Sequence, residues 1–141
     1  KKYIARYPNV LKEKTCFITN GFDADSLTMN LHKLRNDKFV LSYIGRLTDG
    51  IRDPEFFLEG FKMASNNSGF AENVELRMIG YIEDFVDIIE SYNNHGNIKI
   101  TKVVPRKESL ELMMESDALI IIQSIQGEGS DVISGKLFEY F

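Results

Sequence analysis

Short apolar blocks bounded by polar or glycine residues occur along most of the chain. Runs rich in β-branched and aromatic residues predict strands, because such side chains suit a pleated, half-buried surface. The blocks with this character are Thr15–Thr19, Phe39–Ile44, Val74–Ile79 and Asn97–Val104. A fifth block, Asp117–Gln123, is apolar throughout between its two polar ends, which is typical of a strand that is buried on both faces.

Segments with apolar residues at helical spacing separate these blocks. Asp53 and Pro54 suit the cap and first turn of a helix, because the aspartate oxygen accepts a free backbone N–H and proline needs no donor there. Asn66–Gly69 would end that helix. The helical core positions that the pattern predicts are Phe57, Phe61 and Ala64, then Phe85, Ile88, Ile89 and Tyr92, then Leu110, Met113 and Met114, and last Leu137, Phe138 and Phe141.

The alternating order of predicted strands and helices indicates an α/β fold. Short connections favour a Rossmann-like, doubly wound parallel sheet with right-handed crossovers and helices on both faces. The 141 residues suit a single domain spanning residues 1–141. Ligands of such sheets bind beyond the carboxyl ends of the strands, where we expect Asn20, Gly45, Arg46, Gly80 and the loop 126–135 to lie.

Composition narrows the classes of function. A formal net charge of −4 and the lack of a basic patch argue against nucleic acid as a partner. The single cysteine, Cys16, excludes an internal disulfide, is expected to be buried in its apolar run, and favours a cytosolic compartment. No cluster of His, Cys, Asp and Glu has metal-ligand spacing, and no apolar run is long enough to cross a membrane.

The segment Gly129–Phe141 predicts an anion site. It continues a glycine-bearing loop, and Ser134 offers an N-cap oxygen for a helix whose free N–H groups favour anions. Glu139 lies four to five residues into this helix, roughly 6–8 Å from its start at about 1.5 Å per residue. Its carboxylate can accept two hydroxyl donors, as a vicinal diol requires. The alternative interpretation is a solvated glutamate on a helix surface.

Three short motifs resemble those of a known enzyme family. Lys136–Tyr140 resembles the K-L-x-E-Y segment of the retaining, nucleotide-sugar-dependent glycosyltransferases called family 4 or group 1. Ile18–Asp23 is similar to the I-x-N-G-V-D stretch that opens their C-terminal half, and Gly45–Leu47 resembles their G-R-L turn. The resemblance runs from about Tyr7 to Phe141. It implies a partial C-terminal, donor-binding domain, which is a truncated half of a GT-B fold.

The resemblance also implies roles for individual residues. Glu139 would bind the donor ribose and close an E-x7-E motif whose first acid is Asp131 in this chain. Arg46 would contact the donor diphosphate. The family's second cation falls on Ile51 here, so Arg52 and then Lys136 are the candidates to supply that charge.

Other positions of the expected donor site lie at further strand ends. Gly80 and Tyr81 end the third predicted strand, where members of the family line the base pocket. Val104 ends the next strand and would either pack on the nucleobase or serve as a core residue. The complete donor-binding set that we expect is Asn20, Gly45, Arg46, Gly80, Tyr81, Val104, Gly129, Asp131, Ser134, Gly135 and Glu139, and the expected catalytic cations are Arg46, Arg52 and Lys136.

The implied activity is transfer of a sugar from a nucleotide diphosphate sugar to a saccharide or lipid-linked acceptor with retention, as in polysaccharide biosynthesis. Cations and a helix N-terminus would stabilise the leaving diphosphate, so neither a metal nor a cofactor is expected. The family's catalytic histidine lies in an N-terminal domain that this chain lacks, and we therefore expect the chain alone to be inactive. A cytoplasmic location is expected, with peripheral membrane contact by the full-length protein as an added option.

Two other classes of function stay open. The chain could be a non-catalytic doubly wound nucleotide-binding or receiver-like module whose glycines serve only as turns. A receiver would need an acidic cluster at the strand ends. The chain could also belong to a GT-B sugar-nucleotide epimerase, which would bind the same donor diphosphate and catalyse a different reaction.

Overall fold

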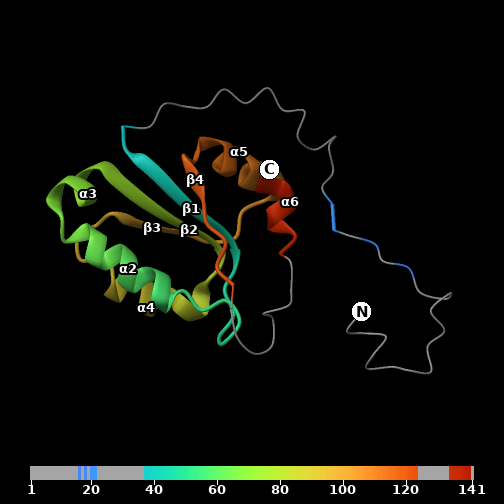
Figure 1. Cartoon of the computed structure of the whole chain (residues 1–141), viewed down its shortest axis with the longest axis horizontal. Coiled ribbons are helices and arrows are strands. Elements are labelled where there is room, and N and C mark those ends of the chain that lie inside the picture. Colours follow the sequence, from blue (N-terminus) through green and yellow to red (C-terminus); the bar gives the residue numbers. More distant parts are fainter. Residues whose placement is uncertain (1–15, 17, 19, 22–36, 124–133, 141) are drawn as a thin grey trace.

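The computed structural model describes residues 16, 18, 20, 21, 37–123 and 134–140. Strands and helices alternate in this part of the chain (Figure 1). The elements in chain order are β1 (Phe39–Arg46), α2 (Glu55–Ser65), α3 (Ser68–Asn73), β2 (Val74–Tyr81), the 3-10 helix η3 (Glu83–Phe85), α4 (Val86–Ser91), β3 (Ile98–Thr101), α5 (Arg106–Glu115), β4 (Ala118–Leu119) and α6 (Lys136–Tyr140).

The four described strands form one parallel sheet in the order β3-β2-β1-β4. β1 and β2 pair along their whole length, from Phe39 opposite Val74 to Arg46 opposite Tyr81. Because β4 pairs with the other side of β1, the carboxyl ends of β1 and β4 flank a topological switch point. Open α/β sheets bind ligands at such points. The fold is therefore α/β and Rossmann-like, as the sequence predicts.

Helices cover both faces of the sheet, with α2 and α4 on one face and α5 and α6 on the other (Figure 1). Neighbouring residues of a strand point to opposite faces. Accordingly, Tyr43 and Met78 belong to one hydrophobic cluster, while Ile44 and Ile79 belong to a second one. The first cluster includes residues of α2 and α4, and the second includes residues of α5.

Side-chain oxygens accept backbone hydrogen bonds at the starts of two helices. Asp53 Oδ1 accepts a hydrogen bond from the backbone N–H of Glu55 at 2.9 Å, in keeping with the predicted start of α2. Asn67 Oδ1 accepts one from Phe70 N–H at 3.4 Å and begins α3. We expected the segment around Asn67 only to end α2, so the short helix α3 is an addition to the predicted order.

The buried face of α2 differs from the predicted one. Phe57 and Ala64 are only half-buried. Ser65 is buried instead, because Asn97 Nδ2 donates a hydrogen bond to its hydroxyl at 3.2 Å. A count of apolar positions overlooks a serine whose hydrogen-bonding needs are met in this way. The buried residues of α2 are Leu58, Phe61 and Ser65.

The strands β3 and β4 are shorter than predicted. β3 covers four residues of the expected 97–104, and β4 covers two of the expected 117–123. Residues 118–123 are half-buried, so the prediction of a strand buried on both faces is wrong. The physical reason is that β4 pairs only with β1 among the described strands and therefore lies at an edge of this sheet.

Hydrogen bonds fix the start of β4 against β1. Asp117 Oδ2 accepts from the backbone N–H of Val40 at 2.8 Å, and Asp117 N–H donates to the Val40 carbonyl at 2.8 Å. The hydroxyl oxygens of Ser116 and Ser42 are 2.6 Å apart. These contacts set the register of β4 against β1.

Two expectations of burial are wrong. Met114 is 47% exposed, since α5 buries Ser109 rather than Met114, and the Ser109 hydroxyl is satisfied by donating to the Arg106 carbonyl at 2.7 Å. Cys16 is exposed rather than buried, and Ile18 is 84% exposed. Neither of these two residues is in a strand, and the rest of the strand predicted at 15–19 lies outside the described residues.

Candidate functional site

Two glycines face each other at the carboxyl ends of β1 and β2. Gly45 pairs with Gly80, and a Cβ on Gly80 would collide with the Gly45 carbonyl. The φ angle of Gly80 is +124°, which L side chains rarely adopt. A Cβ on Gly45 would collide with the ammonium end of Lys136. Because neither glycine has a side chain, the two strand ends approach closely, and Lys136 can lie against the backbone of Gly45.

Lys136, the first residue of α6, lies over the buried ring of Tyr43. Its Nζ is 4.0 Å from the ring centroid, which is a cation–π contact. Burial and, to a smaller extent, the positive charge of Arg52 lower the pKa of Lys136 to about 8, while Glu139 opposes that shift. The ammonium is therefore a partly desolvated cation beside another cation, and an anion bound there would stabilise it.

Tyr43 connects this lysine to the end of β1. Its hydroxyl donates a hydrogen bond to the Arg46 carbonyl at 2.7 Å. Burial raises the pKa of Tyr43 to about 12, with Arg52 acting in the opposite direction. Tyr43 is thus a neutral donor at physiological pH, and its ring is a fixed platform under Lys136.

The two arginines of the predicted set lie close to the same strand end. Arg46 is exposed, and its guanidinium carbon is 4.3 Å from the centroid of the Tyr81 ring, on the neighbouring strand. Arg52 returns towards β1 through a tight turn in which its N–H donates to the Thr48 carbonyl at 2.7 Å. Arg52 acts electrostatically on both Tyr43 and Lys136, so it shares their site.

Glu139 forms an ion pair that the sequence patterns do not predict. Arg106, the first residue of α5, donates a hydrogen bond from Nη1 to Oε2 at 3.1 Å, and its Nη2 is 3.0 Å from Oε1. Glu139 also interacts electrostatically with Lys136, three residues earlier on α6. Arg106 directly follows Pro105, which ends the predicted strand 97–104, and this is a sequence signal for the carboxyl edge. Its partner Glu139 could be found only from the placement of α6.

The other predicted residues are placed as follows. The Ser134 and Gly135 carbonyls accept hydrogen bonds from Leu137 and Phe138 at the start of α6, both at 3.1 Å. Val104 packs against the second hydrophobic cluster, in keeping with its interpretation as a core residue. Asn20 is exposed and outside the regular elements. Gly129 and Asp131 lie outside the described residues.

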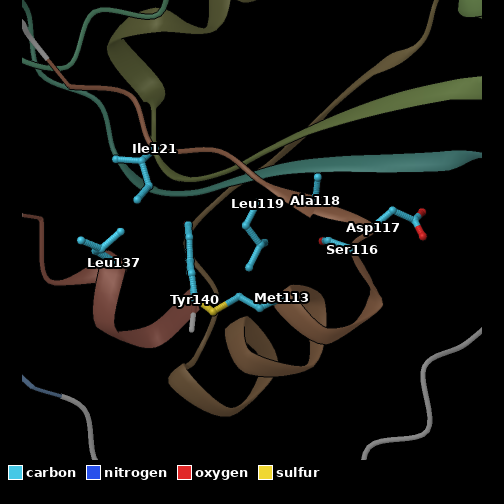
Figure 2. A pocket seen from close by; sticks show the side chains of 8 residues that line it. All are labelled: Met113, Ser116, Asp117, Ala118, Leu119, Ile121, Leu137 and Tyr140. Carbon is cyan, nitrogen blue, oxygen red and sulfur yellow. The ribbon is translucent and has the colours of Figure 1, made fainter.

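A cavity of about 370 Å³ lies between α5, β4 and α6 (Figure 2). Tyr140 points from α6 towards the sheet, with Met113 and Leu119 beside it (Figure 2). Burial raises the pKa of Tyr140 to about 12. No residue of the predicted donor set contributes to the lining, although the lining residue Tyr140 interacts electrostatically with Tyr43 and Glu139. Its lining is Met113, Ser116, Asp117, Ala118, Leu119, Ile121, Leu137 and Tyr140.

The described part of the chain lacks a metal-ligand cluster and a membrane-spanning helix. Within residues 37–123 and 134–140, and the four described residues before them, no three His, Cys, Asp or Glu side chains gather as a metal ion would require. The helices of the same residues include none that is both long and apolar enough to cross a membrane.

Comparison with known proteins gives a likeness among solved structures. No known protein family matches the chain, and no curated protein matches it. Among solved structures it is similar to the crystal structure of WaaG, a glycosyltransferase involved in lipopolysaccharide biosynthesis, with a TM-score of 0.43 and 21% sequence identity. The match covers 60% of this chain and 22% of the WaaG chain. A TM-score and a sequence identity this low do not indicate a function. The function is therefore inferred from the geometry of the site.

Proposed function

We propose that this chain binds the nucleotide diphosphate sugar donor of a glycosyltransferase. In the proposal, Arg46, Arg52 and Lys136 hold the diphosphate, and Glu139 holds the ribose. The acceptor, the retaining course of the reaction and a separate acceptor-binding domain follow from the motif resemblance and belong to the same proposal.

The proposal is based on the position of Lys136, whose ammonium lies against the backbone of Gly45. Its ammonium lies at the carboxyl end of β1, beside the switch point, and shares that place with Arg52. Cleavage of a sugar–phosphate bond leaves a diphosphate with growing negative charge. Cations that are already positioned and partly desolvated stabilise such a charge in the transition state. The described part of α6 has five residues, so we ascribe this role to side chains rather than to a helix dipole.

The spacing along α6 supports the ribose assignment. Lys136 and Glu139 are three residues apart, which is roughly 4.5 Å along a helix axis at about 1.5 Å per residue. In a nucleoside diphosphate the ribose adjoins the first phosphate. A ligand with its diphosphate at Lys136 would therefore bring its ribose near the Glu139 carboxylate, which accepts hydroxyl donors.

The strand order disfavours the receiver-like alternative. Receiver domains have the order 2-1-3-4-5, in which the first strand lies between the second and third. In this chain β1 lies between β2 and β4. An epimerase would use the same donor site. Analysis of the sugar product distinguishes the two reactions, because a glycosyltransferase transfers the sugar to an acceptor and an epimerase inverts one of its carbon centres.

The first test is a thermal-shift panel of the full chain with UDP, GDP, ADP and their sugars. We expect one nucleotide to raise the melting temperature, and Glu139→Ala to abolish that rise. Glu72→Ala is the matched control, because Glu72 is exposed on α3, which directly precedes the amino end of β2. Full protection of the Glu139→Ala variant would exclude the ribose role.

The second test concerns Arg46 alone. Arg46→Ala should weaken binding of the nucleoside diphosphate by about tenfold, because a hydrogen bond to a charged group contributes roughly 1.5–3 kcal/mol. Binding of the nucleoside without phosphate should be unchanged. Calorimetric titration of both ligands measures the difference, and equal losses would mean that Arg46 does not contact phosphate.

A further inference from the structure

An ion pair between Arg106 and Glu139 connects α5 with α6. Arg106 Nη1 donates a hydrogen bond to Glu139 Oε2 at 3.1 Å, and Nη2 is 3.0 Å from Oε1, so each of the two nitrogens faces a different carboxylate oxygen. Two such contacts restrict the orientation of the carboxylate more than a single contact would. The side chains are 52% and 27% exposed, respectively.

A purely structural role accounts poorly for this geometry. Partly exposed ion pairs contribute little to the stability of a fold, typically up to about 1 kcal/mol. α6 also has other contacts with the rest of the domain, because Tyr140 packs against the second hydrophobic cluster and Lys136 lies on Tyr43. What Arg106 adds beyond these contacts is a fixed orientation of the Glu139 carboxylate.

We infer that Arg106 is a positioning residue that orients Glu139 to accept both hydroxyls of a ribose, so that the site selects ribonucleotides over 2′-deoxyribonucleotides. This inference rests on the proposed donor site. Each carboxylate oxygen can accept two hydrogen bonds. Arg106 donates one to Oε2 and contacts Oε1, so each oxygen keeps at least one accepting position for a ribose hydroxyl.

Arg106 also keeps Glu139 from turning towards Lys136. Glu139 acts on Lys136 as an opposite charge three residues away on the same helix. Without Arg106, the carboxylate would be free to pair with that ammonium and would then compete with the diphosphate for it. The loss of Arg106 should therefore affect the sugar and phosphate parts of the ligand differently, whereas a general loosening of α6 would affect both.

The test compares UDP, GDP and ADP with their 2′-deoxy counterparts by calorimetry on the full chain. The native protein should prefer the ribose form of its best nucleotide by about tenfold, as expected when one hydrogen bond to a charged group is lost. Glu139→Gln should remove most of this preference, and Arg106→Gln should reduce it to about twofold. Arg106→Lys keeps the charge but not the two separate contacts to the carboxylate oxygens, so it should reduce the preference as well.

Lys107→Gln is the matched control, because it removes the neighbouring positive charge from an exposed position of α5. It should keep the full preference for ribose. The preference, rather than the affinity, is the deciding readout, since a structural defect would weaken both forms of the nucleotide equally. If Arg106→Gln does not fold, Arg106→Lys provides the same comparison.

The possible failures are distinguishable. An unchanged preference in the Arg106 variants, together with its loss in Glu139→Gln, would overturn the inference and leave the donor site intact. A native protein with no preference, and no effect of Glu139→Gln, would overturn the ribose assignment and the inference with it. Failure of all six nucleotides to bind would overturn the proposed function itself.

Discussion

The face of the sheet under α2 and the carboxyl edge of β1 are built differently, although Tyr43 belongs to both. On the face, Tyr43, Leu58 and Met78 have no exposed surface and form an apolar cluster. At the edge, the partly buried Lys136 lies over the ring of the same tyrosine and within the electrostatic influence of Arg52. Burying a charge lowers the stability of a fold unless the charge is well paired. We conclude that apolar packing stabilises the fold. The cations at the carboxyl end of β1 are consistent with the proposed anion binding instead.

The largest expected effect is on the apolar face. Leu58→Ala should lower the free energy of unfolding by about 2–5 kcal/mol, because it leaves a cavity in a fully buried site. Phe56→Ala, two residues away at a position 90% exposed, should change it by no more than about 0.5 kcal/mol. Urea unfolding of both variants measures the contrast, and similar losses would mean that the described face of α2 is wrong.

A smaller effect should separate the two glycines at the strand ends. Gly80→Ala should destabilise the protein by about 1–3 kcal/mol, because its Cβ would meet the Gly45 backbone and its φ is +124°. In Gly45→Ala the colliding group is the movable end of Lys136, so stability should change less and nucleotide affinity more. Equal stability losses with equal affinities would remove the distinction between fold and site at this edge.

The smallest effect concerns pH. The pKa of Lys136 is lowered from 10.5 to about 8, so below pH 8 the folded protein contains a charged group that it disfavours. Between about pH 8 and 10.5 the unfolded chain binds the extra proton, and stability should therefore rise with pH in that window. Nucleotide affinity should fall over the same range as the cation is lost. Lys136→Met should lack both trends, and their persistence in that variant would assign them to another group.

The fold follows from local patterns, whereas the site depends on contacts that no local pattern contains. β1 and β2 begin at the predicted residues because their apolar runs are bounded by polar residues, and Asp53 marks the start of α2. The sequence shows Glu139 as a carboxylate near the carboxyl edge. Its pairing with Arg106 depends on how α5 and α6 lie in space, 33 residues apart.

Tyr43 illustrates the same limit within a single strand. In the sequence it is one aromatic residue of an apolar run, and nothing local distinguishes its ring from that of any other core residue. Its hydroxyl bond to Arg46 and its contact with Lys136 arise only when β1 and α6 come together. The burial of Ser65 in place of Ala64 has a similar origin, because its partner Asn97 lies 32 residues away.

The most direct test of the donor site is nuclear magnetic resonance of the ¹⁵N-labelled full chain titrated with UDP, GDP or ADP. Amide shifts map where the diphosphate binds without any substitution. We expect the largest changes at Gly45, Gly80 and Lys136, at the carboxyl end of the sheet. Changes confined to the amino ends of the strands, around Phe39 and Val74, with those three amides unmoved, would contradict the account.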